Sequence, residues 1–486
     1  MSIKSWWQRE VQASLAWIII GGLVAAFIAL FFSWQLGFFC LLFMATAWWV
    51  WDNPEPGFWL LIVLAPLLPM LKITQTIGTA TLIKDVIILT LFMRQFLWPL
   101  IKQTLPYRRA ALTAPIVWLV IWTIIEMVRA DNGLLLGVLR ARDIILYVLL
   151  YFGVLYLPHS KKLMKQRLYW LLATSLVVYL QGVYQWWWAM DSAVLRFDPV
   201  RQIWIPRISS TLAHPSIFGQ YAVSISLLVA ALAAYSKPAG KRAGWLLLWL
   251  MSLPFIWLTY SRAVWIGLVV GIGVMVTNWG ATGVAKKISK RTMLKIVIGL
   301  GVVGVVGVIG ASRFTPIGLY VRSFVDPRYA SNRERLEFMA RLIAPMTNWE
   351  AMVGQGLGDV LVQNFRQNDI ELYDIAVGNS RDVQLTKNRT LVDNQYLKTG
   401  VEMGLTGLLL YGWIYWRFLR TGAVDMKKMG REGKIISLWG VGFLAAFVVQ
   451  AFFIDIWDIW PTNAMFWIVA GLVGASSQMV LINEKK

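Results

Sequence analysis

The chain has 486 residues, of which 58% are hydrophobic and only 15% are charged, and this composition excludes a set of ordinary soluble domains. A net charge of +21 is large for such a chain, because charged groups are costly within hydrocarbon and must lie mainly in the connecting segments. One cysteine and two histidines exclude a disulfide framework and a metal cluster built on these residues.

Apolar segments long enough to cross a bilayer recur along the whole chain. The first follows a short polar start, and the last ends just before the C-terminus. We expect fourteen of them, at 15–32, 36–51, 58–71, 79–93, 114–128, 144–157, 169–188, 217–235, 243–258, 263–279, 295–311, 396–416, 435–452 and 461–482. The sequence therefore predicts an all-α polytopic membrane protein with about 12–14 transmembrane helices, in a single integral membrane domain over 1–486.

The cations divide unevenly between the two sides of the predicted bundle. With the N-terminus in the cytoplasm, the inner segments hold 26 of the 46 Lys and Arg residues, as 16 Lys and 10 Arg. This excess predicts that both termini are cytoplasmic. The other 20 are 16 Arg and 4 Lys. Since a planar guanidinium matches phosphate or carboxylate oxygens in pairs, an arginine-rich outer side predicts an anion site; the alternative is that these arginines pair with acidic residues nearby.

One predicted outer segment, 312–395, is long enough to suggest a function. Within it, apolar residues at helical spacing predict an amphipathic helix over about 332–346, packed either on lipid or on protein. The run Gly354-Gln-Gly-Leu-Gly358 then predicts a tight turn. Elsewhere, Lys84 and Asp85 inside a predicted span indicate an internal ion pair or an interface position, with a role in transport as the alternative.

Three polar elements lie on the predicted outer side, each beside the start of a span. The first runs from Arg207 through His214-Pro215, the second is the short turn Thr259-Tyr-Ser-Arg262, and the third runs from Asp393 to Gly404. Two arginines and a carboxylate would thus meet at the outer membrane boundary. Taken alone, each arginine is also compatible with a simple anchor at a helix end.

In this order, the three elements resemble the O-antigen ligase and polymerase family of bacterial envelope glycan assembly. The resemblance rests on Arg207 with His214-Pro215, on Ser261-Arg262-Ala263 with Trp265, and on a long outer loop with Trp349 and a Gly-x-Gly turn. It ends in Asn394-Gln-Tyr-Leu397 and Glu402-Met-Gly404, where the histidine expected before the asparagine is Asp393. The resemblance covers about 200–415.

This resemblance implies a fold of the GT-C-like kind and a metal-independent glycosyltransferase without a cofactor. The enzyme would transfer glycan from an undecaprenyl-diphosphate carrier to an acceptor glycan, at the outer face of the bacterial cytoplasmic membrane. The expected partners are therefore the polyprenyl-diphosphate-linked oligosaccharide, the acceptor and the lipid bilayer, with a chain-length regulator or a flippase as further partners and no nucleic acid.

The chemistry assigns roles to a few residues. Arg207 and Arg262 would neutralise the leaving diphosphate, and Asp393 would act as general base on the acceptor hydroxyl. Asp393 could instead bind a sugar hydroxyl or an arginine, or act only as a helix N-cap, and His214 is an alternative base. The remaining residues expected to bind substrate are His214, Arg333, Arg335, Asn394, Glu402 and Tyr260.

Two further questions stay open at the level of sequence. The replacement of the family histidine by Asp393 favours a polymerase, or another surface or exopolysaccharide glycan transferase, over a ligase that uses a lipid or protein acceptor. A different class, a secondary transporter or flippase of an anionic substrate, would also use an arginine-lined mouth, but no internal repeat is evident. A structural scaffold would leave the outer arginines unexplained.

Overall fold

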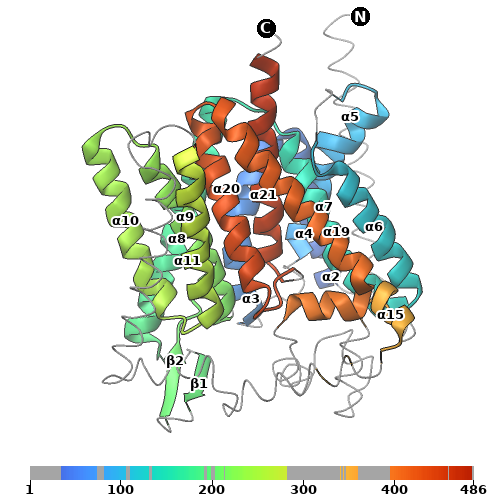
Figure 1. The fold of residues 1–486 in the computed structure, drawn as a ribbon. Coiled ribbons are helices and arrows are strands. Elements are labelled where there is room, and N and C mark those ends of the chain that lie inside the picture. Colours follow the sequence, from blue (N-terminus) through green and yellow to red (C-terminus); the bar gives the residue numbers. More distant parts are fainter. Residues whose placement is uncertain are drawn as a thin grey trace, which may run out of the picture.

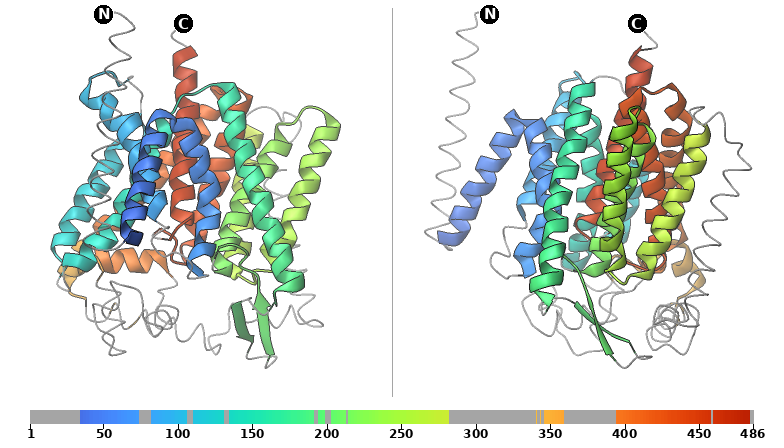
Figure 2. Two further views of the ribbon diagram at one scale, coloured as in Figure 1. Left: turned by 180° about the vertical axis from the view of Figure 1, so that it is seen from behind. Right: turned by 90° about the vertical axis from the view of Figure 1, so that its left-hand side faces the viewer.

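The computed structural model describes residues 34–73, 82–105, 110–130, 134–190, 194–198, 203–212, 214–281, 340, 343, 346–358, 394–457 and 459–483. Over these residues the chain forms a bundle of long helices, with one hairpin of strands at one end (Figure 1). In two further views the hairpin projects beyond the same end of the helices (Figure 2).

The first half of the described chain is helical throughout. Its elements are α2 (Trp34–Asp52), α3 (Pro54–Ile73), α4 (Ile83–Phe92), the π-helical turn η2 (Met93–Leu97), α5 (Trp98–Ile101), α6 (Thr113–Val128), α7 (Leu134–Leu155) and α8 (Lys161–Trp188).

The second half adds the hairpin and the remaining described helices of the bundle. Its elements are β1 (Val194–Asp198), β2 (Ile203–Arg207), α9 (Pro215–Ala234), α10 (Ala239–Trp257), α11 (Arg262–Ala281), α15 (Asn348–Val353), α19 (Gln395–Asp425), the 3-10 turn η4 (Met426–Lys428), α20 (Arg431–Gln450) and α21 (Thr462–Asn483).

The helices lie where the apolar segments predicted them. Every predicted span that falls wholly on described residues lies within a helix, apart from at most two residues at one end of the span, and several of these helices are four to ten residues longer than predicted at one end. Among the described residues, α9, α11 over Arg262–Trp279 and α20 are long and apolar enough to cross a membrane. The fold is thus that of a helical membrane protein, and the total of 12–14 spans stays a prediction, because 15–32 and 295–311 lie outside the described residues.

Helix α7 is the clearest departure from the predicted boundaries. The apolar window predicts 144–157, whereas the helix begins ten residues earlier, at Leu134. The added turns contain Arg140, Arg142 and Asp143, whose charges lower the mean hydropathy, so that an apolar window does not include them. Arg140 and Arg142 are both accommodated by ion pairs with carboxylates on other helices.

The prediction of a purely helical fold also omitted the hairpin. Strands β1 and β2 pair antiparallel, with Val194 opposite Arg207 and Asp198 opposite Ile203. In β2, Ile205 is buried and Trp204 is exposed, which is the alternation of a strand with one covered face. The hairpin matters because its last residue is Arg207, so that a strand rather than an irregular loop delivers this arginine.

Helix α19 is bent sharply at Gly404, whose φ of 65° and ψ of −171° are not helical. Its first part, from Gln395 to Met403, runs across the end of the bundle, and its second part runs along the bundle (Figure 1). A positive φ favours glycine at this position. The bend therefore places the N-terminus of α19 at the same end as the hairpin and α15.

The centre of the bundle is formed by α9, α20 and α21. Trp439 of α20 and Trp467 of α21 are fully or almost fully buried there. The indole nitrogen of Trp439 donates to the carbonyl oxygen of Ser224 on α9, at 2.9 Å. These contacts fix the position of α9, whose first turn carries polar residues of the candidate site.

Candidate functional site

Arg207 is held at the junction of the hairpin with two helices. The backbone nitrogen of Ile208 donates to the carbonyl of Leu258, which fastens the end of β2 to the end of α10. The Arg207 side chain is buried, and its Nε donates to the carbonyl of Thr259 at 2.8 Å. Its Nη2 donates to the hydroxyl of Ser216, in the first turn of α9, at 3.4 Å. The guanidinium is therefore pre-oriented by neutral oxygens.

The turn Thr259–Ser261 connects this group directly to Arg262. Ser261 donates its hydroxyl to Ser216 at 3.3 Å, so that Ser216 lies between the Arg207 guanidinium and the turn. Tyr260 has a φ of 46°, which is unusual for a residue with a side chain and sharply reverses the chain. Arg262 follows as the first residue of α11 and is half-buried. The structure thus brings the segments of Arg207, Tyr260 and Arg262 to one junction.

His214 completes this junction as the N-cap of α9. Its Nδ1 accepts a hydrogen bond from the backbone nitrogen of Ser216 at 3.2 Å. Burial, and to a smaller extent the positive charge of Arg207, lowers the pKa of His214 to about 4. His214 is therefore neutral near pH 7, and because Nδ1 accepts, its proton lies on Nε2. In this state the free ring nitrogen is a donor, which suits contact with an anion better than proton abstraction.

A second polar group surrounds Glu402 in the first part of α19. Glu402 is buried, and one of its carboxylate oxygens accepts from Nη2 of Arg140 at 2.9 Å. The other oxygen accepts from the backbone nitrogen of Gly358 at 3.3 Å. Asn394 caps α19 by accepting from the backbone nitrogen of Leu397 at 3.1 Å. The alternative that Asp393 is the cap of this helix is therefore wrong.

The remaining predicted residues fall outside the described part of the chain. They are Asp393, Arg333 and Arg335, and most of the amphipathic helix expected over 332–346; Ala340 and Ile343 are helical. The predicted tight turn at 354–358 is confirmed, since its three glycines have φ values of 99°, 111° and 90°. The described residues form two groups, one around Arg207 and one around Glu402.

Several residues that the sequence reading missed lie close to these groups. Arg140 is the partner of Glu402, and Lys398 forms a buried ion pair with Asp455, in the segment between α20 and α21. The predicted internal pair of Lys84 and Asp85 is confirmed, and Asp85 also binds Arg142. A signal for Arg140 existed, because Arg140, Arg142 and Asp143 directly precede an apolar window. Its partner, 262 positions away, could not be read from one sequence.

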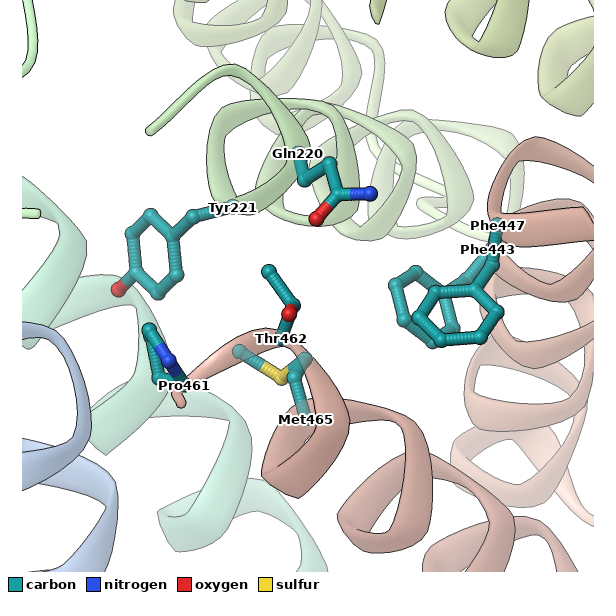
Figure 3. A pocket seen from close by; sticks show the side chains of 7 residues that line it. All are labelled: Gln220, Tyr221, Phe443, Phe447, Pro461, Thr462 and Met465. Atoms are coloured by element: carbon teal, nitrogen blue, oxygen red, sulfur yellow. The ribbon is translucent and has the colours of Figure 1, made fainter. Parts of the chain in front are cut away.

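A small pocket lies between α9, α20 and α21, with room for about one water molecule (Figure 3). Gln220 and Tyr221 border it together with two phenylalanines, and the Gln220 amide points toward its centre. Gln220 and Tyr221 are both buried, at 4% exposure. In the described structure neither the amide of Gln220 nor the hydroxyl of Tyr221 has a hydrogen-bond partner. Gln220 is one helical turn below Ser216 on the same face of α9. We expect an ordered water here, since buried polar groups are normally satisfied.

Comparison with known protein families gives a match that covers part of the candidate site. A family model described as O-antigen ligase matches residues 246–412. The matched residues include Tyr260, Arg262, Asn394 and Glu402, whereas Arg207 and His214 precede them. A comparison with curated protein sequences gives no match.

Proposed function

We propose that the protein is a membrane glycan transferase, because a family model described as O-antigen ligase matches residues 246–412. Its donor is an oligosaccharide linked to a polyprenyl diphosphate, and its acceptor is a second glycan. The reaction takes place at the outer boundary of the bacterial cytoplasmic membrane. The family match is the observation that carries this proposal, and the arrangement around Arg207 supports it.

The proposed reaction needs neither nucleotide nor metal. The acceptor hydroxyl attacks the anomeric carbon of the donor, and the bond between that carbon and the phosphate oxygen breaks. The bonding electrons leave with the diphosphate, whose negative charge grows in the transition state. A base takes the proton of the acceptor hydroxyl. The energy of the lipid diphosphate linkage drives the transfer.

Arg207 and Arg262 are proposed to stabilise the leaving diphosphate. An arginine oriented before the reaction lowers the barrier because it needs little rearrangement as charge develops. The contacts of Arg207 with Thr259 and Ser216 provide such orientation. His214, neutral and with a proton on Nε2, is proposed as an additional donor to a phosphate oxygen. Asp393 is proposed as the base.

The polymerase activity is proposed in preference to a ligase activity, because Asp393 stands where the ligase histidine is expected. A polymerase extends one carrier-linked glycan with another, whereas a ligase moves a finished glycan to a lipid or protein. The two differ in their products. A carrier-linked ladder of repeats indicates a polymerase, and a single transfer to a carrier-free acceptor indicates a ligase.

The test uses the purified full-length protein in liposomes, with a synthetic polyprenyl diphosphate oligosaccharide and EDTA. We expect transfer without nucleotide, and a loss of at least about 100-fold in kcat in Arg207→Ala and in Arg262→Ala, as for other oriented donors to a developing anion. Arg242→Ala, near the start of α10, is the matched control and should keep full activity. If no product forms while labelled glycan crosses the liposome membrane, the protein is a transporter and the proposal fails.

A further inference from the structure

We infer that Arg140, Glu402 and Gly358 form a clamp that positions the first part of α19 for glycan transfer; this inference rests on the proposed function. We call these three residues the Glu402 clamp. They come from the start of α7, from α19 and from the turn that follows α15. The clamp joins three segments that are far apart in the sequence.

The two oxygens of Glu402 are both used. One accepts from Arg140 at 2.9 Å, and the other from the backbone nitrogen of Gly358 at 3.3 Å. The side chains of Arg140 and Glu402 are 8% and 3% exposed, so that this ion pair is almost free of solvent. A carboxylate with two buried partners is poorly placed to bind a substrate. Glu402, expected at first to contact substrate, is therefore assigned a positioning role.

The turn 354–358 is fastened to α19 by its backbone as well. The nitrogens of Gln355 and Gly356 donate to the carbonyls of Val401 and Glu402, at 2.8 and 3.3 Å. The backbones approach so closely that a Cβ on Gly354 would lie 2.5 Å from the Glu402 carbonyl oxygen. This arrangement leaves almost no freedom for the turn to slide along the helix.

The bend of α19 belongs to the same interlocked unit. A Cβ on Gly404 would lie 2.4 Å from the carbonyl oxygen of Met352, and the hydroxyl of Thr406 donates to that same oxygen at 3.0 Å. In addition, the indole of Trp122 donates to the carbonyl of Met403 at 3.0 Å. The bend is thus held by α15 and by α6.

The opposite end of this first part of α19 is fixed separately. Oε1 of Gln395 accepts from the backbone nitrogens of Ile456 and Trp457, both at 2.8 Å. Between Asn394 and Glu402 the helix rises by about 12 Å. A shift at the clamp would therefore turn this part of α19 about Gln395 and change the direction of its N-terminus, where Asn394 and the proposed base Asp393 lie in the sequence.

The use of charge at the clamp supports a role beyond stability. A buried ion pair gains little over well-packed apolar residues of the same volume, because both charges lose their hydration. What the pair adds is direction, since Arg140 and Gly358 together fix the carboxylate plane. Misplacement of reacting groups by about 1 Å is enough to slow a reaction about 100-fold.

The double variant Arg140→Met/Glu402→Met separates positioning from folding. Each single variant leaves one buried charge without its partner and should lower the yield of folded protein, whereas the double variant should recover that yield. We expect kcat of the double variant to fall about 10- to 100-fold, with KM for the carrier-linked donor within about threefold of the original protein. Glu402→Gln keeps an acceptor for Gly358, so its kcat should lie between those of the original protein and the double variant.

The matched control is the buried ion pair of Arg167 and Glu55, which joins α8 to α3. The double variant Glu55→Met/Arg167→Met should keep kcat within about threefold. Hydrogen–deuterium exchange gives a readout independent of activity. The amides of 355–358 should exchange at least about tenfold faster in Arg140→Met/Glu402→Met than in the original protein, and should be unchanged in the control.

Unchanged exchange at 355–358, or a kcat within threefold of the original, would overturn the clamp. An equal fall of kcat in the control pair would also overturn it, because the effect would then be general to buried ion pairs. If the original protein transfers no glycan while exchange changes as expected, the proposed function fails and the clamp serves another activity. The two failures are therefore distinguishable.

Discussion

At the scale of single residues, the junction around Arg207 depends on how each polar group is already occupied. His214 illustrates this best, because its Nδ1 accepts from Ser216 and its environment disfavours a positive charge. The sequence suggested His214 as an alternative base. Its hydrogen bond and lowered pKa instead favour a neutral donor, and neither could be read from the residue type alone.

The first prediction concerns pH. The pKa of His214 is lowered to about 4, so its neutral form persists as the pH falls from 8 to about 5 and is lost only as the pH approaches 4. The variant His214→Asn, which preserves an N-cap acceptor, should reduce kcat/KM several-fold without changing the shape of its pH profile between pH 5 and 8. Measured profiles of transfer rate check this. An inflection near pH 6.5 that disappears in the variant would contradict it.

The second prediction concerns the proposed base. Asp393→Asn removes proton acceptance at nearly constant size, and general-base catalysis contributes about 100-fold or more. We therefore expect kcat to fall at least about 100-fold, while binding of the carrier-linked donor changes little. Asp382→Asn, also in the segment 359–393, is the control. Activity within about threefold of the original would exclude Asp393 as the base.

At the scale of elements, sequence reading located helices well and their ends and bends poorly. The apolar windows predicted α9, α10, α11 and α20 to within a few residues, because a sustained apolar window is the main sequence signal of a transmembrane helix. The charged start of α7 escaped, since its arginines are compensated by residues distant in sequence. The bend in α19 was not predicted either, because nothing in the sequence distinguishes Gly404, which has a non-helical backbone, from Gly407 or Gly412, which do not.

The third prediction follows from that difference. Gly404→Ala places a Cβ at a φ of 65° and 2.4 Å from the Met352 carbonyl oxygen, so the bend cannot form without displacement. We expect a loss of about 2 kcal/mol or more in the free energy of unfolding, seen as a lower midpoint of thermal unfolding in detergent. Gly412→Ala, in the straight part of the same helix with open space around it, should be neutral or slightly stabilising. Equal behaviour of the two variants would refute the bend.

The fourth prediction concerns the pocket beside α9. Replacing an amide that has only water as a partner by an apolar side chain of similar shape is nearly neutral. Gln220→Met should therefore change the free energy of unfolding by less than about 1 kcal/mol. Thermal unfolding in detergent measures the change. A larger loss would mean that the Gln220 amide is bound to something more than a single water.

At the scale of the whole molecule, the candidate residues that the lysine and arginine distribution assigns to one side of the membrane lie at one end of the bundle. The hairpin, α15 and the first part of α19 all lie at one end of the bundle (Figure 1). The candidate residues Arg207 and Glu402 belong to β2 and α19 at that end, and Tyr260 lies in the turn between α10 and α11 that contacts Arg207. The sequence reading placed these same residues on the outer side, from the bias of lysine and arginine. It could not foresee that they form two groups, because helix order around a bundle is set by packing.

The fifth prediction is the orientation of the bundle. In a protein whose native Cys40 is replaced by alanine, Trp204→Cys places a thiol on the exposed hairpin, and Gly240→Cys places one at the start of α10. A membrane-impermeant maleimide applied to spheroplasts should label Trp204→Cys but not Gly240→Cys. Detergent should expose both thiols to the reagent. The reverse pattern would place the candidate site in the cytoplasm.

The fastening of turn 354–358 to α19 has a consequence for how such a protein can diverge. Residues 359–393 leave the described structure at Gly358, which is bound to α19, and return at Asn394, the cap of that same helix. Both ends of this segment are joined to one element, so a segment of different length could connect the same two points; for a flexible loop in general, doubling the length costs only about 0.6 kcal/mol of closure entropy. The segment between Gly358 and Asp393 can therefore be exchanged for another without altering the two points at which it is attached. Acceptor preference could thus be rewritten over residues 359–392, while the proposed base Asp393 and the frame that orients the reaction are inherited unchanged.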